Sequence, residues 1–509
     1  MQSTIESIQQ AVKPHDQFQF EIKLDYELLD GRQTRYTVET YIFAPHTLGI
    51  SADTYSKKSF YRDVQNYIRL KTPAMLLRDF VESTNSPLVA IYDLISQPDW
   101  ISNGSTLRQL NTYFKLLAAM LNSAIREHLI HTKARIEEVG PNGKVYLVVD
   151  NLVEEFLTET ETISAHFRDM FSTFNLPHVS EEILNGYQLT DESISILIEE
   201  GLIELFTIVD NYSKKSNRPD FSKRISDRVG QETKHRRQHG YLSLLNSLDE
   251  NETYLYRASV LKKYAASVLF LSADISKDGQ RLTHLGNAIA AGIAMIFATL
   301  VAFYFQSQFD NFTLPVFAAL VVGYMFKDRI KEVSRDRFSQ RLQLFLHDRR
   351  IVIRTQDGVK LGFLKEKVDF IAESQVPRLV LKSRNRDQFS RIDSDGREEK
   401  VIRHSKEIVL YANAFEQIFG DMVQITGIND ILRYDIRAYL NKMAEPIQER
   451  SYLENEELRS ISCHKVYHLN IVSRYKTIRP HKAKIHSRIR LVLDRVGIKR
   501  METIPESTF

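Results

Sequence analysis

The sequence has few of the residues that build cross-linked or low-complexity proteins. Its 509 residues include one cysteine, Cys463, which excludes an intramolecular disulfide framework and a multi-cysteine zinc or iron–sulfur site within one chain. Glycine (19) and proline (13) are scarce, which excludes collagen-like chains. With 26% charged and 43% hydrophobic residues, the chain fits neither a disordered protein nor a many-helix transporter. The length predicts about two to four folded units.

Net charge is also small, at +3, and by itself predicts no partner. The charges are unevenly distributed. Residues 150–210 contain 14 Asp or Glu and a single base, Arg168, whereas residues 474–500 contain ten Lys or Arg and a single acid, Asp494. The chain is therefore strongly dipolar along its length.

One stretch lacks charge altogether. Leu285–Phe305 is 21 residues without Asp, Glu, Lys, Arg or His, and as a helix it would reach about 30 Å, the thickness of a bilayer core. A second uncharged run, Phe312–Phe326, could span if its helix continues to Ile330 with basic side chains snorkelling. We therefore expect a transmembrane hairpin with spans at 285–305 and 312–330. The alternatives are a pair of buried helices in a soluble domain, or a second helix that is only re-entrant.

The flanks of this hairpin predict its orientation. Lys and Arg precede the first run and follow the second, whereas the connecting loop 306–311 contains neither. The positive-inside rule then places both termini in the cytoplasm and the loop outside, in a multi-pass membrane protein with two spans. The N-terminal residues do not resemble a signal peptide. Gly286, Ala290 and Ala294 recur every four residues and allow close approach of the second helix or of another copy.

The N-terminal residues 1–283 are expected to form a mostly helical cytoplasmic domain with small β-hairpins. Alternating apolar residues predict strands at Phe18–Leu28 and Thr34–Phe43, paired through an Asp30-Gly31 turn. A second hairpin is predicted from Ala134–Val139 and Lys144–Val149, with Gly140–Gly143 as its turn. Apolar residues three and four apart predict helices that include Thr106–Ile130 and Thr190–Tyr212.

After the hairpin (284–330), helical spacing continues through a predicted stalk at 331–348, and a period of two then begins. Residues 349–509 are expected to form an α+β cytoplasmic domain with an antiparallel sheet. Its predicted strands are Arg350–Arg354, Val359–Leu364, Glu399–Leu410, His464–Tyr475, Ile489–Asp494 and Ile498–Ile504. Helices are predicted around Glu416–Ile425 and Asp430–Met443.

The basic segment supplies the candidate anion-binding residues. In Arg488-Ile489-Arg490-Leu491 the arginines alternate with apolar residues, so one strand face would be packed and the other cationic. The candidates are Arg474, Lys476, Arg479, Lys482, Lys484, Arg488 and Arg490. Their surface could be solvated or dock an acidic protein segment such as 150–210, bind anionic lipid headgroups, or bind nucleic acid, which is less favoured because Tyr475 is the only aromatic residue in the run.

No metal or catalytic motif is convincing. Glu232, His235 and His239 share a helix face and could hold a metal, but the neighbouring bases favour a solvated charged helix. His464 and His468 beside Cys463 would lie about 13 Å apart on a strand, too far to share an ion. The remaining motifs fit turns or lack further ligands: Gly140–Lys144, His347-Asp348 and Asp393–Gly396.

Neither a nucleophile elbow nor a dinucleotide or kinase signature is present, which lowers an enzyme assignment without excluding it. We therefore expect a non-enzymatic membrane protein that faces the cytoplasm and acts in assembly, scaffolding or regulation. It would need no cofactor, and its partners would be the bilayer and either a second copy or another protein. The alternatives are a membrane-tethered enzyme and a membrane-anchored nucleic-acid binder that uses residues 474–500.

Overall fold

The computed structural model describes residues 8–29, 33–138, 146–216, 221–243, 248–308, 313–384, 400–416, 418–420, 423–477 and 484–504. The chain divides into two compact units. Unit 1 comprises Met1–Ile68, Ser272–Ala412 and Asp430–Phe509, and unit 2 comprises Arg69–Leu271 and Asn413–Asn429. This division differs from the predicted N-terminal domain 1–283, because the first 68 residues form strands that pair with strands after residue 400.

Unit 1 is built on two antiparallel sheets and a separate two-stranded ribbon. The larger sheet has the order β14-β13-β12-β3-β8-β7-β6-β5, the smaller sheet has the order β1-β2-β9-β4, and β10 pairs with β11 in the ribbon. Their bounds are β1 Ile8–Pro14, β2 Gln19–Glu27, β3 Gln33–Ala44, β4 Val64–Leu70, β5 Ser272–Ser276, β6 Arg349–Arg354, β7 Lys360–Ala372, β8 Lys400–Tyr411, β9 Gly427–Asp435, β10 Ile447–Glu454, β11 Glu457–His464, β12 Tyr467–Thr477, β13 Lys484–Asp494 and β14 Gly497–Ile504. The expected antiparallel sheet is thus confirmed.

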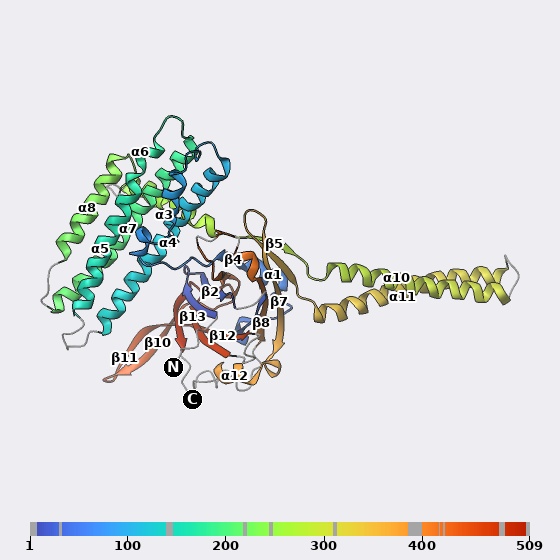
Figure 1. Cartoon of the computed structure of the whole chain (residues 1–509). Helices are drawn as coiled ribbons and strands as arrows, with labels where there is room; N and C mark the ends of the chain where they lie inside the picture. Colours follow the sequence, from blue (N-terminus) through green and yellow to red (C-terminus); the bar gives the residue numbers. More distant parts are fainter. Residues whose placement is uncertain are drawn as a thin grey trace, which may run out of the picture. The chain divides into compact units, whose positions relative to one another are not determined.

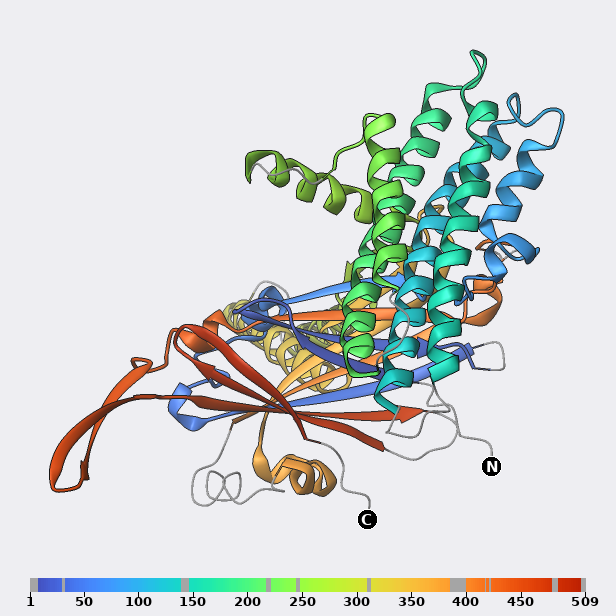
Figure 2. The ribbon, with the colours of Figure 1, turned by 90° about the vertical axis from the view of Figure 1, so that its left-hand side faces the viewer.

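Alternation along the central strands produces two buried faces on the larger sheet. On β3, Tyr36, Val38 and Ile42 point to one side, and Tyr41 and Phe43 point to the other. The first side lies toward the smaller sheet. The second side is covered by the short helix α12, Arg378–Arg384, whose Val380 joins a core cluster with Tyr41, Phe43, Ile371, Val376, Val401 and Val472. Figure 2 shows α12 as the light-orange helix below the red strands.

Three predictions about strand pairing and element type are not met by the described residues. The strands predicted at 18–28 and 34–43 exist as β2 and β3, but they do not pair with each other: β2 lies between β1 and β9, and β3 lies between β12 and β8. The helix predicted at 430–443 is instead mainly strand β9, followed by the four-residue helix α15, Arg437–Leu440. The helix predicted at 416–425 is not formed by the described residues there; α14 ends at Phe415. Asp430 is a charged residue that points into the interior of unit 1, so the alternation of apolar residues expected of a strand is interrupted in β9.

Unit 2 is a helical bundle (Figures 1 and 2). Its helices are α2 Asp79–Glu82, α3 Pro87–Ile95, α4 Gly104–Glu138, α5 Tyr146–Asp169, α6 Phe171–Phe174, α7 Glu181–Ser216, α8 Ser222–Gln238 and α9 Leu248–Ala266. The helices predicted at 106–130 and 190–212 are confirmed within α4 and α7. Gly201 lets α7 approach closely, since a Cβ there would lie 2.8 Å from Ile125 and 3.0 Å from Phe156.

The β-hairpin predicted at 134–149 is wrong. Ala134–Glu138 is the last part of α4, and Tyr146–Val149 begins α5. The Gly140–Lys144 motif lies outside the described residues. The alternating pattern in these segments was too short to distinguish a strand from a helix end.

A long helical hairpin belongs to unit 1. Helix α10, Gln280–Gln308, packs antiparallel against α11, Leu314–Phe345, and the pair extends as the yellow arm of Figure 1. Helix α11 runs without interruption from the second uncharged run through most of the predicted stalk. The hairpin is therefore a single rigid element rather than a span with a separate stalk.

Candidate membrane hairpin and neighbouring sites

The α10–α11 hairpin grows out between two paired strands. Ser276 at the end of β5 pairs with Arg350 at the start of β6, so only short connectors join the sheet to the helices. Asp278 ties these connectors together: its carboxylate lies 3.4 Å from the backbone nitrogen of His347 and 3.5 Å from Lys365 Nζ. Gly279 adopts a left-handed conformation at φ +68°, and a Cβ there would clash with Leu346. The root of the hairpin is thus held at both ends.

Small residues on α10 are used inside the hairpin. Gly286, Ala290 and Ala294 are buried, and a Cβ at Gly286 would lie 1.8 Å from a ring carbon of Phe338. The sequence left two partners open for this stripe, the second helix or another copy. The structure shows that the partner is the second helix.

Helix α10 is the one described helix that is long and apolar enough to cross a membrane. Only 11% of its most apolar 18-residue window is buried within the chain, unlike the core helix of a soluble domain. Helix α11 does not qualify, because its charges begin at Lys327. The structure therefore supports one candidate span, and the second predicted span is not established.

An open basic cleft lies at the root of the hairpin. Helix α1, Lys57–Asp63, contributes Lys57, Lys58 and Tyr61, and the two connectors contribute further residues; the lining also includes Ile275, Ser276, Lys277, Asp348 and Arg349. Lys57 Nζ lies 2.9 Å from Asp348 Oδ1, and the guanidinium of Arg349 stacks 3.9 Å from the centre of the Tyr61 ring. Four bases line the cleft against one acid, so it is electropositive.

A buried ionic cluster lies between the two sheets of unit 1. Lys406 on β8 places Nζ 2.5 Å from Asp430 on β9 and 3.4 Å from Glu366 on β7. His404 lies beside it, with Nδ1 3.1 Å from the hydroxyl of Tyr434. All five side chains are almost completely buried. Two carboxylates therefore compete for one lysine.

The pKa values of the two carboxyls separate accordingly. Burial by itself would raise the pKa of Glu366, but Lys406 and His404 outweigh burial and hold that pKa at about 2. Burial raises the pKa of Asp430, and the attraction of Lys406 offsets only part of this effect. The pKa of Glu366 is thus lowered and that of Asp430 is raised, although Asp430 lies closer to Lys406.

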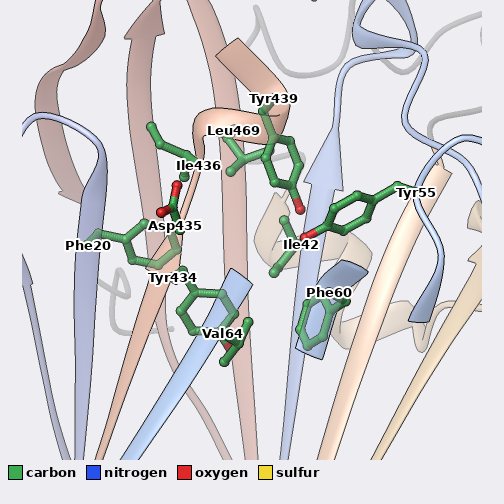
Figure 3. A pocket seen from close by; sticks show the side chains of 10 residues that line it. All are labelled: Phe20, Ile42, Tyr55, Phe60, Val64, Tyr434, Asp435, Ile436, Tyr439 and Leu469. Atoms are coloured by element: carbon green, nitrogen blue, oxygen red, sulfur yellow. The ribbon is translucent and has the colours of Figure 1, made fainter. Parts of the chain in front are cut away.

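An aromatic pocket adjoins this cluster. Phe20, Tyr55, Phe60, Tyr434 and Tyr439 line it together with Ile42, Val64, Asp435, Ile436 and Leu469 (Figure 3). The space between them would hold no more than about one water molecule. The hydroxyl of Tyr55 donates to Asp63 at 2.9 Å, and Phe60 contacts His404 edge-on. The pocket is too small for an organic substrate, so its geometry fits packing of the sheet interior.

Three members of the predicted anion-binding set have described side chains, and these three do not form a free cationic surface. Arg488 is 1% exposed and donates to Asn470 Oδ1 at 3.0 Å. Arg474 lies 3.5 Å from Glu39, and Arg490 lies 3.3 Å from Glu502. Ile489 and Leu491 point to the opposite, buried face. Arg479 and Lys482 lie outside the described residues, as does the surface that Lys476 and Lys484 would present. Binding of an anion by this set therefore stays a prediction.

The helix with Glu232, His235 and His239 is α8, and its inner face is buried rather than solvated. Glu232 is completely buried and accepts a two-pronged bond from Arg168, at 2.7 and 3.2 Å. His235 lies 2.7 Å from Asp191. Arg228, one turn before Glu232, lies 2.7 Å from it. The solvated interpretation is wrong for Glu232 and His235, which pair with α5 and α7, whereas His239, just after the last residue of α8, is exposed.

No group of three or more metal-ligating side chains is found among the described residues. Cys463 and His464 belong to β11, whereas His468 belongs to β12, so they are not on one strand as expected. His347 approaches Asp278, and Asp348 is engaged by Lys57. The Asp393–Gly396 turn lies outside the described residues.

Comparison of the chain with protein-family models, with curated proteins and with solved structures finds no match.

Proposed function

We propose that this chain is a membrane-anchored protein that faces the cytoplasm and acts in assembly, scaffolding or regulation. The observation that carries the proposal is α10: 29 residues, about 43 Å long, with an uncharged run of 21 residues that is mostly uncovered by the rest of the chain. Bare apolar surface of this length is costly in water and favourable in lipid. Both units would then lie on the side from which the hairpin enters.

The root of the hairpin supports an anchoring role. The two connectors return to neighbouring strands, so the hairpin is an added arm on a sheet that is complete without it. Basic residues flank both helices, including Lys277 and Arg281 before the first run and Lys327 and Arg329 after the second. Such flanks favour the cytoplasmic side for both termini. The aromatic pocket of unit 1 fits packing of the sheet interior, which agrees with a structural role for this unit.

The test removes the hairpin while preserving the sheet. Because Ser276 pairs with Arg350, replacing residues 277–349 by Asn-Gly would join β5 to β6 through a two-residue turn. We expect the full-length protein to stay in the pellet after an alkaline carbonate wash of cell membranes. The shortened variant should be released and remain folded by circular dichroism. Retention of a folded variant in the pellet, or release of the full-length protein, would overturn the proposal.

A reporter placed after Gln308 tests the finer topology. If both helices cross, a reporter that is active only outside the membrane should be active there and inactive at either terminus. Silence at all three positions, with carbonate resistance preserved, would indicate a hairpin that enters the bilayer without crossing it.

A further inference from the structure

The side of α10 that the hairpin leaves uncovered carries a line of large apolar residues. Leu285, Ile289, Ile293 and Ile296 are spaced four, four and three residues apart, so they follow one side of the helix. Each is at least half exposed. Gly292 lies on the same side between Ile289 and Ile296, and a Cβ there would meet no atom within 4 Å. Ridges of isoleucine therefore border a shallow, open depression.

The register of the hairpin shows which part of α11 lies at this level. Gly286 lies against Phe338, and Val301 lies against Gly323. The helices are antiparallel, so a step of fifteen residues toward the C-terminus on α10 matches a step of fifteen residues toward the N-terminus on α11. The same register places Phe297 at the level of Lys327. The line from Leu285 to Ile296 therefore lies at the level of residues 328–339, which contain seven charged residues: Asp328, Arg329, Lys331, Glu332, Arg335, Asp336 and Arg337.

These charges limit how deeply the hairpin can enter lipid. Charged side chains are costly within the hydrocarbon core, and those of α11 are bound to the same rigid arm as α10. From Ala298 to Gln308 both helices are free of charge at matching levels, and this tip measures about 16 Å. The core is about 30 Å thick, so the tip reaches past its middle. The lower half of α10, from Leu285 to Ile296, is then left at or above the headgroups.

A line of apolar side chains outside the hydrocarbon is costly in water and is stabilised by contact with another protein surface. Insertion into the bilayer favours a second copy of this chain as that surface. Every copy inserts its tip from the same side, so all copies stand in the same orientation and at the same height. The same line of a second copy is therefore presented at the same level, with no charge on α10 between Leu285 and Gln308 to oppose contact. In addition, Gly292 provides a depression into which a large side chain of the partner helix can fit.

We propose that the lower half of α10 is a self-association face, in which Leu285, Ile289, Ile293 and Ile296 pack against the same residues of a second, parallel copy. This proposal rests on the proposed membrane anchoring. The stripe Gly286, Ala290 and Ala294 holds α11, and the neighbouring line holds the second copy. Assembly would thus be confined to hairpins that are inserted side by side.

The first test fills the depression. Gly292→Leu keeps the helix apolar and meets no atom of its own chain, but it would block close approach of the second helix. In mild detergent, we expect the full-length wild type to have twice the mass of one chain and the variant to shift toward one chain by at least tenfold in dissociation constant. The matched control is Gly230→Leu on α8, another helical glycine with nothing within 4 Å, which should leave the mass unchanged.

The second test reports contact in membranes. In a Cys463→Ser background, Ile293→Cys should form a disulfide-linked dimer on mild oxidation. Glu332→Cys should not, because Glu332 lies two residues from both Ile330 and Ser334, the partly buried side of α11, and so points away from the hairpin. A monomeric wild type that withstands the carbonate wash, or equal cross-linking at both positions, would overturn self-association while leaving the anchor intact. Release of the wild type by carbonate would overturn the anchor itself.

Discussion

In the helical bundle of unit 2, the buried carboxylates Asp191 and Glu232 face two arginines, Arg168 and Arg228, with His235 closing the network. In the sheets of unit 1, Glu366 and Asp430 share one lysine. The pKa values follow this difference. Burial alone would raise the pKa of both bundle carboxyls, but their cationic neighbours outweigh it and lower both pKa values. In the sheets one carboxyl pKa is lowered and the other is raised.

The comparison teaches that a buried charge stabilises a fold only through the balance around it. Breaking a balanced buried pair leaves an ion without a partner, which is more damaging than the pair itself is stabilising. Where the balance is already incomplete, a proton can neutralise the excess charge, and the loss of a partner costs less. We therefore expect the largest loss of stability in the interior of the bundle and the smallest at an exposed ion pair on its surface.

The largest effect is expected for Glu232→Gln. This change leaves Arg168 and Arg228 facing a neutral amide in the interior of unit 2, and breaking such a pair costs about 3–5 kcal/mol of unfolding free energy. Trp100, the only tryptophan, lies in unit 2, so its fluorescence during denaturant unfolding reports this unit. Glu200→Gln, at an exposed position of α7, is the matched control and should change stability by less than about 0.5 kcal/mol. Equal effects at the two positions would contradict the balance argument.

A smaller loss is expected for Lys406→Met in the sheets. Glu366 loses its lysine partner, whereas Asp430 is less dependent on that lysine because burial already raises its pKa, so we expect a smaller loss than the about 3–5 kcal/mol of a broken buried pair. Adding Glu366→Gln to Lys406→Met should recover part of this loss, since the stranded charge is removed. Strictly additive losses in the two changes would show that Lys406 and Glu366 are not coupled.

The pH dependence of unit 1 is expected to have two opposite contributions. The pKa of Glu366 in the folded state, about 2, lies below its unfolded value, so its stabilisation is present above about pH 4.5 and is lost as pH falls toward 2. The pKa of Asp430 is raised on folding, so its stabilisation is present below its unfolded pKa and is lost as pH rises through the folded value.

Two variants separate these contributions. Glu366→Gln should remove the loss of stability that accompanies falling pH, and Asp430→Asn should remove the loss that accompanies rising pH through the raised pKa of Asp430. Circular dichroism in the β region, followed against denaturant at several pH values, measures both. An unchanged acid limb in Glu366→Gln would show that another carboxyl controls it.

The sequence predicted the parts of the fold that repeat a simple pattern. Strands β3 and β8 were found because apolar residues alternate along them, and α10 was found because charge is absent over 21 residues. Pairing could not be predicted: β2 and β3 are close in sequence, yet each pairs with strands from distant parts of the chain. The pairing depends on the whole sandwich, which no local window contains.

The charged interiors were missed for a related reason. Asp430 and Lys406 interrupt the apolar faces of their strands, so a pattern based on hydrophobicity reads them as exposed. On α8, however, one signal was available: Ile225, Arg228, Glu232 and Arg236 recur at helical spacing and are all buried. Acidic and basic residues that follow an apolar residue at helical spacing, on the same side of the helix, indicate a buried face made of ion pairs. Its partners Arg168, Asp191 and Glu199 lie on other helices and could not be assigned from spacing.

The smallest effect is expected at the surface of the same bundle. Arg224 on α8 forms a two-pronged contact with Glu154 on α5, as Arg168 does with Glu232, but both of its partners are about half exposed. Water and salt screen such a pair, so Arg224→Ala should cost less than about 1 kcal/mol in the fluorescence assay, and the difference should shrink further at 1 M salt. The Arg224–Glu154 and Arg168–Glu232 pairs have similar contact geometry, but only the second pair is largely buried. A loss comparable to that of Glu232→Gln would therefore show that contact geometry, rather than burial and balance, determines what these ion pairs contribute.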